Sequence, residues 1–313
     1  MSSPVNSYSD KGNPPHLELQ PTPQDPASVL IDELMLDIFS RLDLSSLGAS
    51  RQVCRNWNQI AKAERLWRNV IYREIAFSNR DWARCFGPEV VVHEDRGEEL
   101  ASLPWQQFIA DNRKFHELFP DKSGKDHLML VRIPKTLTAT RLPDTKDEQG
   151  RRIEGELVSG LTLNSLGQLA KQYFPQNGRG YWYIWGPVVS ELGDRPIDRS
   201  CWVLMTKDVL EGSRKQSYSE QQEMVANLAR QSFPGYEVPG TLEAATCILS
   251  QYFADSKTRL YSDDPWIFTR CKDSVQDCLQ TIVGGFASAG LGVTYSSYDV
   301  GGGGIGVAAL RKF

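Results

Sequence analysis

Residues 30–43 read "LIDELMLDIFSRLD", and their apolar pattern decides the expected fold of the N-terminal part of the chain. The apolar residues recur at helical spacing, with Leu34, Ile38 and Leu42 on one row and Met35 and Phe39 on the next. The segments "VCRNW" (53–57) and "LWRNV" (66–70) carry similar stripes. Short helices joined by few residues, each with one apolar face, form a small bundle. We therefore predict a three-helix bundle over residues 28–75.

The apolar residues of this bundle fall into two groups. The predicted core consists of Phe39, Leu42, Val53, Cys54, Trp57, Leu66 and Trp67. A second group forms an apolar strip that stays exposed unless a partner covers it, and its members are Leu30, Ile31, Leu34, Met35 and Ile38. Because so small a bundle buries little surface, we expect it to rest on the next segment or on a partner.

The order and spacing of these segments resemble the F-box, a helical module that docks on the Skp-type adaptor of SCF ubiquitin ligases. The residues that carry the resemblance are Leu30, Asp32, Glu33, Leu34, Ile38, Phe39, Leu42, Val53, Cys54, Arg55, Trp57, Leu66 and Trp67. The resemblance implies that the apolar strip binds the adaptor. One position departs from the family pattern, because Ile31 stands where F-boxes usually have a proline that presets the backbone φ.

The rest of the chain divides by composition. Residues 1–27 are rich in proline and polar residues, which predicts a disordered tail. Residues 76–124 are expected to form a helical connector, and residues 125–313 an α+β domain. In that domain strand-like runs cluster at 127–133, 181–186, 201–206, 266–271, 281–287, 290–295 and 305–310, with helices at 161–174, 217–231 and 241–255. Clustered strands favour an α+β fold with a mostly antiparallel sheet.

The run "YWYIWG" (181–186) is the main candidate for a binding surface in this second domain. Strict alternation along a strand places Tyr181, Tyr183 and Trp185 on one face and Trp182 and Ile184 on the other. Exposed Tyr and Trp side chains are frequent anchors in interfaces. We predict that one face is core and that Tyr181, Tyr183 and Trp185 are a possible target-binding surface.

Composition excludes several classes of protein. The chain has 313 residues and a net charge of −4, which does not suggest nucleic acid as the main partner. No apolar run approaches the ~20 residues that a membrane helix needs. The start of the chain lacks the charged and apolar regions of a secretory signal peptide. Six scattered cysteines are expected to be reduced thiols in the cytoplasm.

The formal chemical motifs are weak. "GGGGIG" satisfies G-x-G-x-x-G, but a dinucleotide site needs a following helix, and only seven residues follow Gly306. Cys271 and Cys278 lack a second pair of ligands for zinc. Cys201 with His127 is an alternative thiol-hydrolase pair without a local signature. We expect no catalytic residue, no metal and no cofactor.

A second resemblance covers residues 180–313. The segments "IWGPVVSELGDRPIDRSCWVLMTKDVLEGSR", "SDDPWIFTRC" and "IGVAALRKF" are similar to F-box-like proteins of chlamydia-related symbionts of amoebae. This resemblance implies an effector that is exported into a host cell. The expected function is a substrate receptor that joins an unidentified target to a Skp-type adaptor. The alternatives are a thiol hydrolase tethered by the F-box, or an interaction module that does not bind an adaptor.

Overall fold

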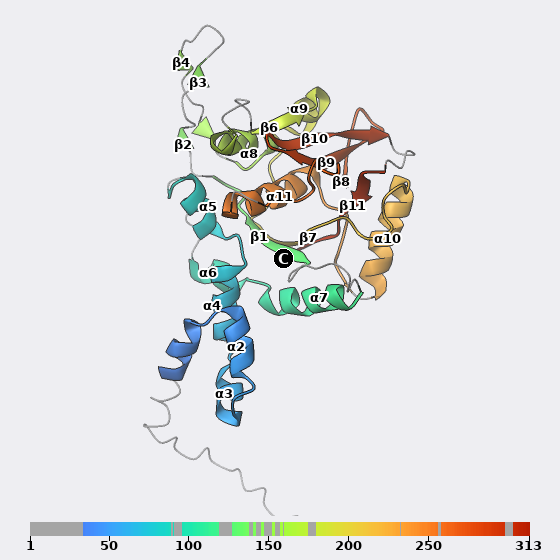
Figure 1. The fold of residues 1–313 in the computed structure, drawn as a ribbon. Helices are drawn as coiled ribbons and strands as arrows, with labels where there is room; N and C mark the ends of the chain where they lie inside the picture. The colour runs from blue at the N-terminus through green and yellow to red at the C-terminus, as the bar shows by residue number, and fades with distance from the viewer. Residues whose placement is uncertain are drawn as a thin grey trace, which may run out of the picture.

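A computed structural model describes most of the chain (Figure 1). The described residues are 34–88, 90, 96–118, 127–137, 140–141, 145–146, 152–153, 157–158, 160–174, 180–231, 233–255, 258–297 and 303–313. The predicted tail and two residues of the apolar strip, Leu30 and Ile31, lie outside these ranges. The fold combines N-terminal helices with a C-terminal part that is rich in sheets, which confirms the predicted α+β class.

The N-terminal module contains four helices instead of the three expected. The described part of the first covers residues 34–40, and it is followed by α2 (Leu44–Ser50), α3 (Arg55–Ile60) and α4 (Glu64–Glu74). The chain breaks between the first two helices because the Asp43 carboxylate caps α2, accepting from the Ser46 backbone N–H at 2.6 Å. The buried side chains of this module form one cluster, Phe39, Leu47, Ile60, Ala61, Leu66 and Val70.

Helix α4 belongs to two hydrophobic cores at once. Leu66 and Val70 lie in the cluster of the N-terminal module. Ile71 and Tyr72 lie in a cluster of the main body, the name used here for the described part of the chain that follows Val70. The module is therefore joined to the body through a single continuous helix.

The segment expected to be a connector is helical and packs into the main body. Its helices are α5 (Asn79–Phe86), α6 (Arg96–Ala101) and α7 (Trp105–Leu118). Before α5, Phe77 pairs with β1 (Leu128–Ile133): its N–H donates to the carbonyl of Leu130 at 2.9 Å, and its carbonyl accepts from the Arg132 N–H at 2.7 Å. Trp82 is fully buried in the main core. Long-range contacts hold α6, since Glu99 accepts from the Tyr72 hydroxyl.

Two sheets form the C-terminal part. The three-stranded sheet has the order β1-β7-β12 and is antiparallel, whereas the five-stranded sheet, β11-β8-β9-β10-β6, is mixed. The long strands are β1 (Leu128–Ile133), β6 (Tyr181–Ile184), β7 (Cys201–Thr206), β8 (Phe268–Val275), β9 (Leu279–Ala287), β10 (Gly290–Ser297), β11 (Ile305–Val307) and β12 (Leu310–Lys312). Between β1 and β6 along the chain lie two short ladders, β2 (Thr140–Arg141) with β5 (Leu157–Val158), and β3 (Thr145–Lys146) with β4 (Arg152–Ile153).

The last strand-like run, 305–310, was expected to be one strand but serves both sheets. β11 pairs with β8, and β12 pairs with β7. Between them, the N–H of Ala308 donates to Thr269 Oγ1 at 2.9 Å and that of Ala309 to Thr206 Oγ1 at 3.2 Å. Because these hydroxyls satisfy the two backbone donors, the chain can leave one sheet and enter the other inside the core.

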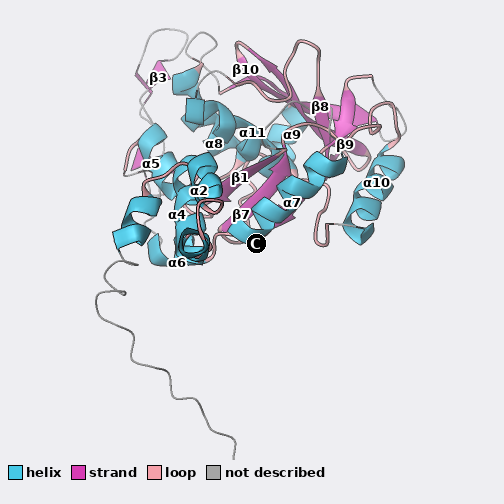
Figure 2. Cartoon of the chain, turned by 60° about the horizontal axis from the view of Figure 1, so that its bottom comes forward, coloured by secondary structure: helices cyan, strands magenta, loops and turns pink. Residues whose placement is uncertain are grey.

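The main body is a stack of layers, in the order α7, three-stranded sheet, α11 (Thr241–Asp255), five-stranded sheet (Figure 1). Figure 2 shows α7 lying across β1 and β7. Side chains of β7 alternate accordingly: Val203 and Met205 lie in the cluster with α11, and Trp202 and Leu204 in the cluster with α7. The remaining helices are α8 (Leu163–Ala170), η1 (Lys171–Tyr173), α9 (Gly186–Leu192) and α10 (Tyr218–Gln231).

Asp111 is a buried carboxyl on the inner face of α7. Burial raises its pKa above the ordinary value of 3.8, against the lowering effect of a hydrogen bond from Gln107. At pH values between the pKa of Asp111 in the unfolded chain and its higher pKa in the folded protein, the folded state binds more protons than the unfolded state. The protein therefore loses stability as the pH rises through this range.

We expect Asp111→Asn to raise the melting temperature at pH 7, because the neutral amide avoids the cost of burying a charge. The gain should shrink as pH falls toward 4, since the wild-type carboxyl becomes protonated in the folded state. Thermal unfolding followed by circular dichroism at both pH values tests this. The control is Asp277→Asn, which changes an exposed carboxyl in the turn after β8. A lower melting temperature for the Asp111 variant at pH 7 would contradict the conclusion that the buried Asp111 carboxylate destabilises the fold.

Candidate functional site

The first helix presents an exposed apolar strip. Leu34 is 60% exposed and Ile38, one helical turn later, is 45% exposed. Met35 is only half-buried and packs against the core of the module. The described members of the predicted strip thus divide into two that face solvent and one that supports the helix. Exposed apolar side chains at i and i+4 suit a partner that offers an apolar groove.

Arg73 of α4 fixes the end of this first helix. Its guanidinium donates to the carbonyl oxygens of Ser40 at 2.6 Å and of Leu42 at 2.7 Å. These carbonyls lie at the C-terminal end of a helix, where no further turn supplies a donor. The cation therefore attaches the exposed strip to α4.

Most of the predicted core residues of this module pack as expected. Phe39 and Leu66 are buried, and Leu42, Trp57 and Trp67 are half-buried against the same cluster. Trp57 meets Phe39 edge-on with ring centroids 5.3 Å apart.

Two residues do not belong to that core. Val53 is 61% exposed, and Cys54 is exposed as well. The periodic interpretation was wrong here because residues 51–53 form a turn, so that the helical stripe begins only after it. Cys54 is the N-cap of α3, and its sulfur accepts from the Trp57 N–H at 3.5 Å.

The aromatic run on β6 is placed differently from the prediction. Tyr181 is buried and donates its hydroxyl to the Leu163 carbonyl at 3.0 Å, so it is a core residue. Trp182 and Tyr183 are the exposed members. Strict alternation fails because the register with β10 shifts between Leu291 and Gly292, where β6 carries an extra residue. Such a bulge turns neighbouring side chains toward the same side.

Trp266, which precedes β8, completes an exposed aromatic surface, defined here as Trp182, Tyr183 and Trp266. The Trp182 ring lies 5.6 Å from each of the other two, between ring centroids. Its indole N–H donates to the Gly285 carbonyl at 2.9 Å, which fixes the ring.

Glycines form the floor beneath this surface. A Cβ on Gly285 would lie 2.6 Å from the Trp266 ring, and a Cβ on Gly292 would lie 2.9 Å from Trp182 Nε1. The large rings can lie close to the sheet only because these positions have no side chain. Trp185, the third predicted member, is half-buried and packs against Tyr295, with ring centroids 3.9 Å apart and ring planes tilted by 32°.

Cys201 and His127 are too far apart to form a hydrolase pair. Cys201 pairs with Ile133 at one end of the β1-β7 ladder, six residues from His127. At ~3.4 Å per residue, the two residues lie about 20 Å apart. Burial also raises the pKa of the Cys201 thiol, which disfavours the reactive thiolate.

The described residues contain no group of three or more His, Cys, Asp and Glu side chains that could hold a metal ion. None of the helices in the described ranges is long and apolar enough to cross a membrane. In "GGGGIG", Gly303 and Gly304 form a turn that leads directly into β11. A strand follows this turn, whereas a dinucleotide site requires a helix.

The exposed apolar strip on the small helical module is typical of a surface that binds another protein. Residues 32–73 match the family model described as F-box-like. The chain therefore carries an F-box-like domain. No curated protein and no solved structure matches the chain. The resemblance of residues 180–313 to symbiont proteins stays a prediction.

Proposed function

We propose that this protein is a substrate receptor of an SCF-type ubiquitin ligase, in which the F-box-like domain binds a Skp-type adaptor. The observation that carries the proposal is the exposed pair Leu34 and Ile38 on the first helix of a domain that matches the F-box-like model. A receptor of this kind acts by raising the concentration of a target near the ubiquitin-charged enzyme. It needs no catalytic residue of its own.

The target would bind to the main body. The aromatic surface of Trp182, Tyr183 and Trp266 supports this assignment, because rigid exposed aromatic rings lose little conformational entropy on binding. It replaces the predicted set of Tyr181, Tyr183 and Trp185, of which only Tyr183 belongs to the exposed group. The role as an exported effector in a host cell, which the second resemblance implies, stays a prediction.

The proposal is tested by the affinity of the full chain for a purified eukaryotic Skp-type adaptor, measured by isothermal titration calorimetry. We expect Leu34→Asp combined with Ile38→Asp to weaken binding at least about 100-fold. Burying two such side chains contributes roughly 3–6 kcal/mol, and a charge in their place would be buried without a partner.

Leu118→Asp is the matched control, because Leu118 is also an exposed leucine, at the end of α7 in the main body. It should leave adaptor binding unchanged, and circular dichroism should show all variants folded. Absence of binding by the wild type would favour the alternative in which the module does not bind an adaptor. Equal losses from both variants would show that the loss of binding is not specific to the first helix, which contradicts the assignment of the apolar strip as the adaptor-binding surface.

A further inference from the structure

Two histidines from different elements approach each other at one end of the three-stranded sheet. His116 lies in the last turn of α7, and His127 directly precedes β1. Nδ1 of His116 and Nε2 of His127 are 3.4 Å apart, whereas the ring centroids are 5.6 Å apart. Because the nitrogens are much closer together than the ring centres, each ring turns a nitrogen toward the other ring.

The backbone of His127 is held on two sides. Its N–H donates to Asn112 Oδ1 of α7 at 2.6 Å, and its carbonyl accepts from the N–H of Lys207, which follows β7, at 2.9 Å. Asn112 and His116 are four residues apart and therefore lie on the same side of α7. The contact that fixes His127 against the helix thus also places its ring beside His116.

The distance between the two nitrogens matches the geometry of a zinc site. Zn²⁺ binds imidazole nitrogens at about 2.0–2.1 Å with tetrahedral angles, which places two such nitrogens about 3.4 Å apart. The same distance is long for a hydrogen bond between the rings, since an N–H donor usually lies about 2.7–3.2 Å from an oxygen acceptor. A neutral histidine can offer either ring nitrogen as a ligand and carry its proton on the other.

The surroundings of the pair suit a hydrated cation. The carbonyl groups at the C-terminal end of a helix carry partial negative charge, and His116 lies at that end of α7. A small cavity of about 70 Å³ beside His127 is lined by Asp208 and Glu211 as well as Lys207. Water molecules in this cavity can complete the coordination of a metal ion.

We propose that His116 and His127 bind one Zn²⁺ ion through these two nitrogens, with water in the remaining positions. Imidazole is a preferred ligand of zinc, and two ligands held close together act as a chelate. The ion would join the end of α7 to the start of β1. With two protein ligands, the site differs from the groups of three or more side chains that the described residues lack. The inference goes beyond the proposed function and does not depend on it.

Isothermal titration calorimetry of the full chain with zinc chloride in a non-chelating buffer tests the site. We expect one ion per chain and a dissociation constant on the order of 1–100 µM, weaker than that of sites with four protein ligands. His116→Gln and His127→Gln, made separately, should each weaken binding at least about tenfold, because a single imidazole does not chelate. Each variant keeps three of the four histidines of the chain.

Cys54→Ser combined with Cys278→Ser is the matched control, because these two cysteines are exposed and thiolates also bind zinc. It should bind Zn²⁺ like the wild type, and circular dichroism should show every variant folded. Absence of binding by the wild type would mean that the two rings share only a hydrogen bond, which overturns the proposal. Binding that is lost in the cysteine variant, or that either histidine variant keeps, overturns it as well.

The adaptor experiment and the zinc experiment fail independently. The variant with Leu34→Asp and Ile38→Asp should still bind Zn²⁺, because its changes lie in the N-terminal module. Likewise, the two histidine variants should bind the adaptor like the wild type, since both histidines lie in the main body.

Discussion

Replacing Trp202 by alanine is expected to lower the free energy of unfolding by about 3–5 kcal/mol. Trp202 is fully buried in β7, the central strand of the three-stranded sheet. Its indole N–H donates to the Glu99 carbonyl of α6 at 3.1 Å, and its ring meets Tyr72 of α4 edge-on, 6.4 Å away. The substitution would leave a cavity between the sheet and the helices that carry the F-box-like domain.

Urea unfolding followed by far-ultraviolet circular dichroism measures this loss. Trp202→Phe keeps much of the ring volume but removes the N–H donor, so it should lose less than the alanine variant. Tyr183→Ala removes an exposed aromatic ring and should change stability by no more than about 0.5 kcal/mol. A loss below about 1 kcal/mol for the alanine variant would mean that Trp202 does not join these elements.

Gly180→Ala is expected to destabilise the protein by about 3 kcal/mol, at the upper end of the usual cost of overpacking. A Cβ on Gly180 would lie 1.9 Å from the Gly167 carbonyl oxygen and 2.7 Å from its Cα. Both are backbone atoms of α8, so relief requires movement of the helix or of the start of β6. The same movement would displace Trp182 and Tyr183.

Gly48→Ala makes the same chemical change in α2, where nothing lies within 4 Å of an added Cβ. It should stabilise the protein by about 0.5–1 kcal/mol, because alanine favours the helix more than glycine does. Urea unfolding of both variants tests the pair. Effects of the same sign would show that the close approach of Gly180 to α8 does not constrain the fold.

Local periodicity predicted the F-box-like domain well, because its helices are short and their apolar stripes are contained in neighbouring residues. It was wrong for Val53 and Cys54, since a turn at 51–53 interrupts the stripe. The run "YWYIWG" was correctly predicted to be a strand. Its exposed residues depended on the bulge against β10, which the sequence of β6 alone does not reveal.

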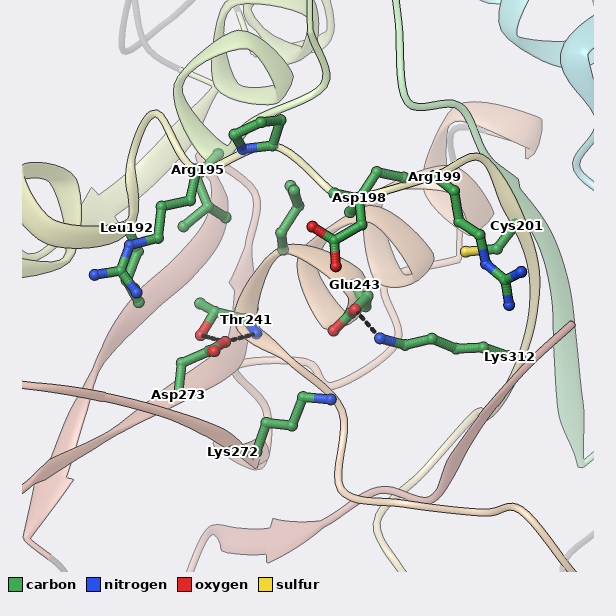
Figure 3. A pocket seen from close by; sticks show the side chains of 14 residues that line it. Leu192, Arg195, Asp198, Arg199, Cys201, Thr241, Glu243, Lys272, Asp273 and Lys312 are labelled. Atoms are coloured by element: carbon green, nitrogen blue, oxygen red, sulfur yellow. Dashed lines mark hydrogen bonds and ion pairs between the residues drawn. The ribbon is translucent and has the colours of Figure 1, made fainter.

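Long-range contacts set the parts that the sequence did not predict. The run at 305–310 divides between two sheets because hydroxyls of Thr206 and Thr269, distant in sequence, accept from its backbone. A pocket beside the first turn of α11 (Figure 3) is lined by residues from segments between Leu163 and Lys312. These segments lie far apart in the sequence, so no local pattern predicts the pocket.

The continuity of α4 sets the geometry of any complex that this protein forms. Helix α4 contributes Val70 to the core of the F-box-like domain and Ile71 to a core of the main body. The orientation of the two parts about the axis of this helix is therefore fixed. One residue added between them would turn one part against the other by about 100° around the helix axis. In a ligase complex, the continuous helix α4, rather than a flexible linker, would thus determine which lysines of the target lie within reach of the ubiquitin-charged enzyme.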